Sequence, residues 1–141
     1  MAPYDYLDHT ADVGIVATGA SLEEAFSAAG EGLAALLCAP ETVAEVEERE
    51  VSATVASAAD VEALLVEWLS EINFQFAVGE FAFRSFEVRE VGEGVVRAVG
   101  RGERLDPSRH RVGEGVKAVT YHGLEVRQGA DGWSVRVILD I

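Results

Sequence analysis

The chain has 141 residues, of which 49% are hydrophobic, and carries 11 Lys and Arg against 25 Asp and Glu. This length suits one domain, residues 1–141, whose core needs neither disulfides nor a structural metal. The formal net charge of −14 repels phosphate backbones and anionic lipid surfaces, so we expect no direct, tight nucleic-acid binding and no membrane association. The single Cys38 and the lack of an apolar run of about 20 residues favour a cytoplasmic protein.

The first half of the chain predicts two helices, each preceded by a strand. Ser21 followed by Glu24 forms a capping box that opens the first helix, and Pro40 ends it. Asp60 caps the second helix, which has the clearest amphipathic stripe in the chain. The predicted elements are a strand at 14–18, a helix at 21–37, a strand at 51–56 and a helix at 61–76.

Beyond Gly79 the apolar residues recur with a period of two, which predicts strands only. Turn residues at His122-Gly123 and at 129–132 favour consecutive antiparallel hairpins for the last three strands. The order of elements predicts an α+β, two-layer single domain, in which a mixed, largely antiparallel sheet packs against two amphipathic helices. The predicted strands are 81–88, 95–99, 116–121, 124–128 and 133–139.

Polar residues gather near both ends of the chain. Asp8, His9 and Asp12 fall within five residues before the first predicted strand, where they form either part of a site or a turn whose side chains bond nearby backbone. Asp140 ends the last predicted strand, and the α-carboxylate of Ile141 follows it. Such oxygens suit Ca²⁺, Mg²⁺ or Mn²⁺, whereas an exposed, fraying terminus is the simpler interpretation.

Lys117 and His122 are further candidates for chemistry, together with His9. Lys117 can pair with a carboxylate or a phosphate, or be an ordinary solvated lysine. His122 and His9 are candidate ligands or acid/base groups, or loop residues that form hydrogen bonds. The sequence has no phosphate loop, nucleophile elbow, dinucleotide fingerprint or His-Glu-x-x-His helix. The residues alone therefore predict a soluble α+β domain with a candidate carboxylate metal site.

Several stretches together resemble the archease family, and they follow one another from one end of the chain to the other. They are Tyr6-Leu-Asp-His-Thr-Ala-Asp-Val-Gly14, Ser21-Leu-Glu-Glu-Ala-Phe26, Val116-Lys-Ala-Val-Thr-Tyr-His-Gly-Leu-Glu-Val126 and Val135-Arg-Val-Ile-Leu-Asp-Ile141.

The resemblance implies a two-layer α+β fold and a divalent-metal site, for calcium or for magnesium or manganese. Its ligands would be Asp12, Asp140 and the carboxylate of Ile141. Partner contact or support of these ligands would fall to Asp8, His9, Lys117 and His122.

The resemblance also implies an accessory protein and not an enzyme. Its partner would be the tRNA-splicing RNA ligase, which joins RNA 3′-phosphate or 2′,3′-cyclic phosphate ends to 5′-hydroxyl ends. The accessory protein would promote guanylylation of that ligase and its multiple turnover. One alternative is a chaperone or modulator of a tRNA methyltransferase or another RNA-processing enzyme. Another is a metal-dependent hydrolase that uses Asp12, Asp140 and a histidine, although no nucleophile motif supports it.

Overall fold

The computed structural model describes residues 3–8 and 12–141. Within that part of the chain, none of the helices is long and apolar enough to cross a membrane. The elements in order are β1 (Tyr4–Asp8), β2 (Asp12–Gly19), α1 (Leu22–Leu37), a short 3₁₀ helix (Pro40–Thr42), β3 (Glu47–Thr54), α2 (Val61–Ala77), β4 (Phe81–Gly92), β5 (Val95–Arg104), β6 (Ala118–Gly129) and β7 (Gly132–Asp140).

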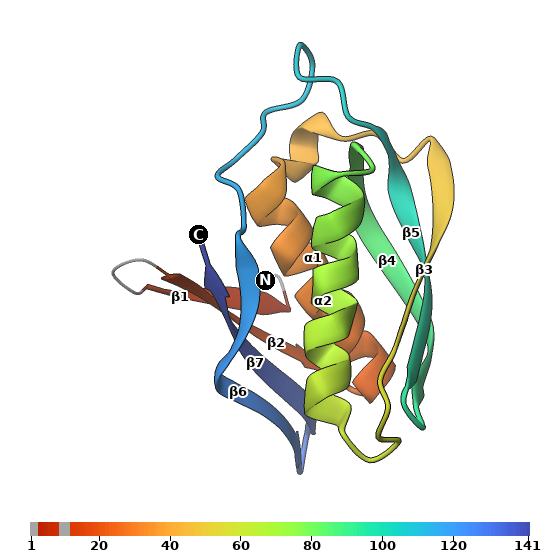
Figure 1. Cartoon of the computed structure of the whole chain (residues 1–141), viewed down its shortest axis with the longest axis vertical. Helices are drawn as coiled ribbons and strands as arrows, with labels where there is room; N and C mark the ends of the chain where they lie inside the picture. Colours follow the sequence, from red (N-terminus) through yellow and green to blue (C-terminus); the bar gives the residue numbers. More distant parts are fainter. Residues whose placement is uncertain (1–2, 9–11) are drawn as a thin grey trace.

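The two helices lie between two antiparallel sheets (Figure 1). The first sheet has the order β1-β2-β7-β6, and the second has the order β3-β5-β4. Helix α1 packs against β2 and β4, while α2 packs against β6 and β3. The predicted α+β class with two helices is confirmed. The structure differs from the predicted arrangement because the strands divide into two sheets, with the helices between them instead of on one face of a single sheet.

Helix α1 is apolar and small-sided on nearly every side because a sheet approaches it from two directions. A Cβ added at Gly30 would lie 3.0 Å from Phe86 Cδ2, in the second sheet. A Cβ added at Gly32 would lie 3.1 Å from Tyr4 Cγ, in the first sheet. The buried residues of α1 are Ala25, Phe26, Ala28, Ala29, Gly30, Gly32, Leu33, Ala34 and Leu37.

Both predicted helix starts are confirmed by their capping bonds. The backbone N–H of Glu24 donates to Ser21 Oγ at 3.1 Å, and Glu24 Oε1 accepts from the backbone N–H of Ala20 at 3.1 Å. At the start of α2, Asp60 Oδ1 accepts from the backbone N–H of Ala63 at 2.9 Å. These bonds satisfy N–H groups that have no partner within the helix.

The predicted break in the last strands is wrong at one point. Residues 116–121 and 124–128 were expected to form two strands joined by a turn, but residues 118–129 form one strand, β6, with an irregularity between Thr120 and Glu125, and residues 116 and 117 precede it. Gly123 has a φ of +67°, which serves a bulge as readily as a turn. The predicted hairpin between β6 and β7 is confirmed.

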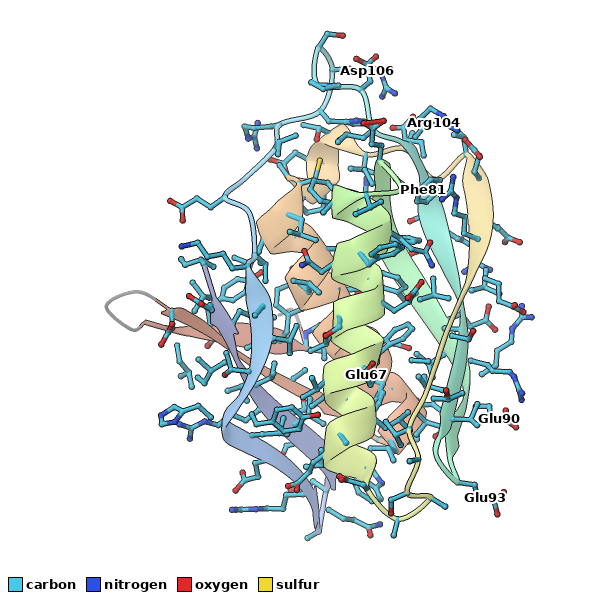
Figure 2. The ribbon with its side chains drawn as sticks, viewed as in Figure 1. Glu67, Phe81, Glu90, Glu93, Arg104 and Asp106 are labelled. Atoms are coloured by element: carbon cyan, nitrogen blue, oxygen red, sulfur yellow. The ribbon has the colours of Figure 1, made fainter. Side chains whose placement is uncertain are left out.

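The connection from β5 to β6 carries the chain from the second sheet to the first. Figure 2 labels Asp106 in this connection, beyond the end of β5. The connection is tied to the C-terminal end of α1, because Gly113 N–H donates to Leu37 O at 2.9 Å and Ala39 N–H donates to Arg111 O at 2.8 Å. These bonds guide the chain across the ends of the helices.

A buried carboxylate anchors the start of this connection. Glu103 is 7% exposed and receives hydrogen bonds from both Arg109 Nη atoms, at 2.7 and 3.0 Å, and from the Ala44 N–H at 2.7 Å. His110 Nε2 lies 2.9 Å from the same carboxylate. Since His110 Nδ1 accepts from the Asp106 N–H at 2.8 Å, Nε2 carries the proton and donates to Glu103. The Arg109 bonds, followed by those from His110 and Ala44, hold the pKa of Glu103 far below its usual range.

The packing of α1 predicts that both of its central glycines are sensitive to size. We expect Gly30→Val and Gly32→Val each to lower the free energy of unfolding by about 2 kcal/mol or more, because the added side chains meet opposite sheets. Ala35→Val, at a half-buried position of the same helix, is the control and should cost about 0.5 kcal/mol. Urea unfolding measures all three, and sensitivity at only one glycine would contradict two-sided packing.

The Glu103 cluster predicts a pH-dependent contribution to stability. Because the pKa of Glu103 is depressed in the folded state, its carboxylate stabilises the fold fully above the unfolded value of about 4.5, and this contribution is lost as the pH falls toward the folded pKa. The stability lost in Glu103→Gln should therefore be larger at pH 7 than at pH 3 in urea unfolding. Glu125→Gln, which breaks an exposed pair with Arg127, should change little at either pH. A loss in Glu103→Gln that is equal at both pH values would refute the role assigned to this carboxylate.

Candidate functional site

The structure brings together the two acidic residues predicted from opposite ends of the chain. Asp12 opens β2 and Asp140 ends β7, and the two are Cα partners in the antiparallel pairing of these strands. Residues directly opposite each other project from the same face of a sheet, with Cβ atoms about 4.5–5.5 Å apart. Both residues are half-buried. The pairing therefore creates a two-carboxylate cluster.

This pair lies on the face of the first sheet that is turned away from the helices. Ile15 and Val137 are Cα partners in the same two strands, and both are fully buried in the core. Leu139 is fully buried as well. Because strand side chains alternate between faces, Asp12 and Asp140 belong to the outer face. The carboxylates therefore lie on the side of the sheet away from the helices, where both residues are half-buried.

The electrostatics of the pair favour a bound cation. Like charges directly opposite each other across two strands are destabilising. In residues 3–8 and 12–141, neither Asp12 nor Asp140 forms an ion pair with a basic side chain. A positive ion between them would relieve the repulsion.

Lys117 and Ile141 lie at the same end of the first sheet. The backbone N–H of Lys117 donates to Asp140 O at 2.7 Å, and the next residue, Ala118, is the Cα partner of Asp140. The Lys117 side chain is exposed, whereas Ile141 is half-buried against the core. Figure 1 shows the C-terminus at the end of β7, beside the start of β6. Three strands thus converge on the carboxylate pair.

The remaining candidates are placed less closely. Asp8 ends β1 with Val13 as its Cα partner, while His9 lies outside the described residues. His122 is exposed in the irregular part of β6, and its backbone N–H donates to Thr120 Oγ1 at 3.3 Å. Thr120 is the Cα partner of Ile138, two residues before Asp140. The segment with His122 therefore lies farther along the sheet from the pair.

The donor set suits a hard cation, but the described side chains do not complete it. Among them, no group of three His, Cys, Asp or Glu residues is placed to hold a metal. Asp12 and Asp140 supply two carboxylates, so further oxygens must come from elsewhere, and Ile141 adjoins Asp140 in the chain. Carboxylate oxygens suit Ca²⁺, Mg²⁺ or Mn²⁺ more than softer metals.

The carboxylate pair lies outside four grooves on the surface of the protein. Neither Asp12 nor Asp140 lines any of these grooves of about 390 to 660 Å³ in the described part of the chain. Small-molecule substrates usually bind in concave pockets. None of these four grooves would therefore bring a small molecule to the pair.

The cluster around Glu103, including Arg109 and His110, was not predicted from the sequence. Glu103 is buried although it follows Gly102, which is also buried, so the alternation of the strand does not mark it as inward. His110 lies between the predicted strands 95–99 and 116–121, outside any predicted element. This cluster is separate from the carboxylate pair and serves the packing of the β5–β6 connection.

The family model described as "Archease protein family (MTH1598/TM1083)" matches residues 4–141. The protein archease of Methanosarcina mazei is 39% identical over 142 residues, covering 98% of this chain and 95% of that protein. The protein archease of Pyrococcus abyssi is 36% identical over 145 residues, and the match covers 100% of this chain and 100% of that protein.

Two solved structures share the fold. The solution structure of Methanobacterium thermoautotrophicum protein 1598 has a TM-score of 0.78 and 32% identity, with full coverage of both chains. The crystal structure from Thermotoga maritima described as "an archease, possible chaperone" has a TM-score of 0.61 and covers 96% of this chain and 94% of that one. At 21% identity it supports the fold alone. With the family model matched from residue 4 to residue 141, the chain belongs to the archease family.

Proposed function

We propose that this chain is an accessory protein that binds a divalent cation and activates the tRNA-splicing RNA ligase. The cation would be held by Asp12, Asp140 and the α-carboxylate of Ile141. The activation would promote guanylylation of the ligase and its repeated turnover. The observation that carries the proposal is the pairing of Asp12 with Asp140 on the outer face of the first sheet. The choice of partner rests on the resemblance to the archease family.

The residues around the pair have distinct roles in this proposal. Asp12 and Asp140 present two carboxylates on adjacent strands, whose pairing fixes their separation. The bound cation would supply positive charge to phosphate oxygens on the partner's nucleotide or RNA end. The exposed Lys117 would contact a carboxylate or phosphate of the partner. The net charge of −14 favours the basic surface of an RNA-binding partner over the RNA itself.

A general chaperone is the second candidate, and the surface favours it less. A chaperone that holds unfolded clients needs a contiguous apolar surface. Five large apolar side chains are exposed in the described residues; Phe74 and Val78 lie one turn apart at the C-terminal end of α2, and the other three lie on different segments of the chain. The five are Val46, Phe74, Val78, Val112 and Tyr121.

The proposed metal site predicts a loss of affinity when either carboxylate is neutralised. We expect Asp12→Asn and Asp140→Asn each to weaken Ca²⁺ binding by about tenfold or more, measured by titration calorimetry. Without metal, neither variant should be less stable than the wild type, because the like-charge repulsion is removed.

Two comparisons make this test specific. Extending the chain by two glycines beyond Ile141 replaces its α-carboxylate with an amide, so binding should also weaken. Asp131→Asn removes an exposed carboxylate next to Gly132, at the β6–β7 turn, and should leave the affinity unchanged. Equal Ca²⁺ affinity in the wild type and both site variants would contradict the proposed metal site.

The proposed function predicts stimulation of the RNA ligase of the same organism. The wild-type chain should raise both the guanylylated fraction of the ligase and its number of turnovers on RNA with a 3′-phosphate and a 5′-hydroxyl end. Asp140→Asn should lose about tenfold or more of this stimulation. Lys117→Ala should keep Ca²⁺ affinity within about threefold but reduce stimulation, because a rim charge acts on the encounter with the partner.

Aggregation assays on unrelated client proteins separate the two candidate functions. Under the proposal, the wild type does not protect such clients. Protection that persists in Asp140→Asn, together with no effect on the ligase, would replace the ligase proposal with a chaperone.

A further inference from the structure

The two edge strands of the second sheet, β4 and β3, differ in whether a helix accepts hydrogen bonds from their outward backbone N–H groups. The backbone N–H of Val88 donates to Ser27 Oγ at 3.1 Å, and that of Phe86 points to Glu31 Oε2 at 3.5 Å. Ser27 and Glu31 are one helical turn apart on α1. Helix α1 therefore supplies side-chain acceptors to an edge that has no further strand.

The opposite edge, β3, receives no such cover in the part of the chain that is described. Val55 N–H donates to Gly94 O at 2.9 Å, which extends the β3–β5 register by one pair. Hydrogen-bonded pairs alternate along an antiparallel ladder, so Ala53 bonds to β5, while Ser52 and Thr54 direct their backbone N–H and C=O groups outward. No strand is paired with β3 on that side within residues 3–8 and 12–141.

A groove of about 450 Å³ lies between this edge of β3 and α2. Ser52 and Thr54 line one side, and Glu67, Glu71 and Phe74 line the other. Phe74 is 56% exposed, which is unusual for an aromatic side chain on a packed helix. Figure 2 labels Glu67 on α2. This residue lines the groove together with Ser52 and Thr54 of β3.

The charge of the groove is acidic and uncompensated. Glu71 Oε2 accepts from the neutral amide of Gln75 at 2.9 Å, and neither Glu67 nor Glu71 forms an ion pair within the described residues. By contrast, on the outer face of the same sheet Arg101 pairs with Glu48 and Glu87. The groove therefore attracts positive charge that the chain itself does not provide.

We propose that this groove binds an extended, basic segment of a partner protein, which adds to the second sheet as a further strand beside β3. The outward N–H and C=O groups of Ser52 and Thr54 would bond to the backbone of that segment. Glu67 and Glu71 would pair with its Lys or Arg side chains, and Phe74 would pack against the apolar stem of such a side chain.

The charge of β3 argues against a second copy of this chain as the occupant. Glu47, Glu48 and Glu50 lie along the strand, and edge-to-edge pairing of two copies would bring these glutamates together. The proposed groove lies on the second sheet, whereas Asp12 and Asp140 lie on the first. The inference is therefore independent of the proposed metal site and its role.

The test uses the full chain and two fluorescein-labelled peptides, acetyl-(Lys-Val)₄-amide and acetyl-(Glu-Val)₄-amide. Fluorescence anisotropy should show binding of the lysine peptide, and ¹H–¹⁵N spectra should show its largest shifts at the amides of Ser52 and Thr54. The glutamate peptide should not bind. Asp140→Asn should bind the lysine peptide as the wild type does, so failure of the metal site leaves this result intact.

Matched variants separate groove binding from general charge attraction. Ser52→Pro removes an outward N–H that the ladder does not use, and Glu67→Lys reverses a charge in the groove, so each should weaken binding by about tenfold or more. Glu62→Lys makes the same charge change outside the groove and should weaken it by less than about threefold.

Three outcomes would overturn the proposal: no binding of the lysine peptide at 1 mM, equal weakening by Glu62→Lys and Glu67→Lys, or amide shifts that avoid β3. Sedimentation that shows a dimer displaced by the peptide would assign the edge to a second copy and would also overturn it.

Discussion

The close approach of two sheets to one helix is the constraint on which the rest of this structure depends. Helix α1 touches the first sheet at Gly32 and the second sheet at Gly30, and a Cβ atom at either position would crowd an aromatic ring of that sheet. Its few polar residues are also used, because Ser27 and Glu31 accept hydrogen bonds from the edge of β4. Helix α1 therefore packs against both sheets and also accepts hydrogen bonds from the backbone of β4. These contacts fix the position of the sheets on either side of the helix.

The rigidity of this centre allows a charged site at the periphery. The inner face of the first sheet is filled by core residues such as Ile15 and Val137, so the outer face is free to carry Asp12 and Asp140 on paired strands. The β5–β6 connection, anchored at Glu103, leads the chain to the start of β6. There the main chain of Lys117 bonds to Asp140. A like-charge pair is tolerated because the sheet that holds it is stabilised elsewhere.

The acidic charge of the chain is distributed unevenly for a physical reason. On the outer face of the second sheet, arginines offset glutamates, as Arg97 does for Glu90 and Arg101 for Glu48 and Glu87. Among the carboxylates that form no ion pair in the described residues are Asp12 and Asp140 on the first sheet and Glu67 and Glu71 in the groove beside α2. Part of the net charge of −14 thus lies at two places, one suited to a cation and the other to a basic segment.

The sequence by itself determined the two helices, the later strands and the identity of the candidate site residues. Local signals sufficed there, since the caps at Ser21 and Asp60 and the period of the apolar residues act over a few positions. Only the tertiary structure decided that the strands form two sheets, that β6 continues through its bulge, and that Glu103 is buried with Arg109 and His110. These features depend on contacts between residues far apart in the chain or on a backbone irregularity, and neither leaves a periodic pattern. Asp12 and Asp140 illustrate both contributions. Their residue types suggested carboxylate ligands for a metal, but only the pairing of β2 with β7 brought the two residues together.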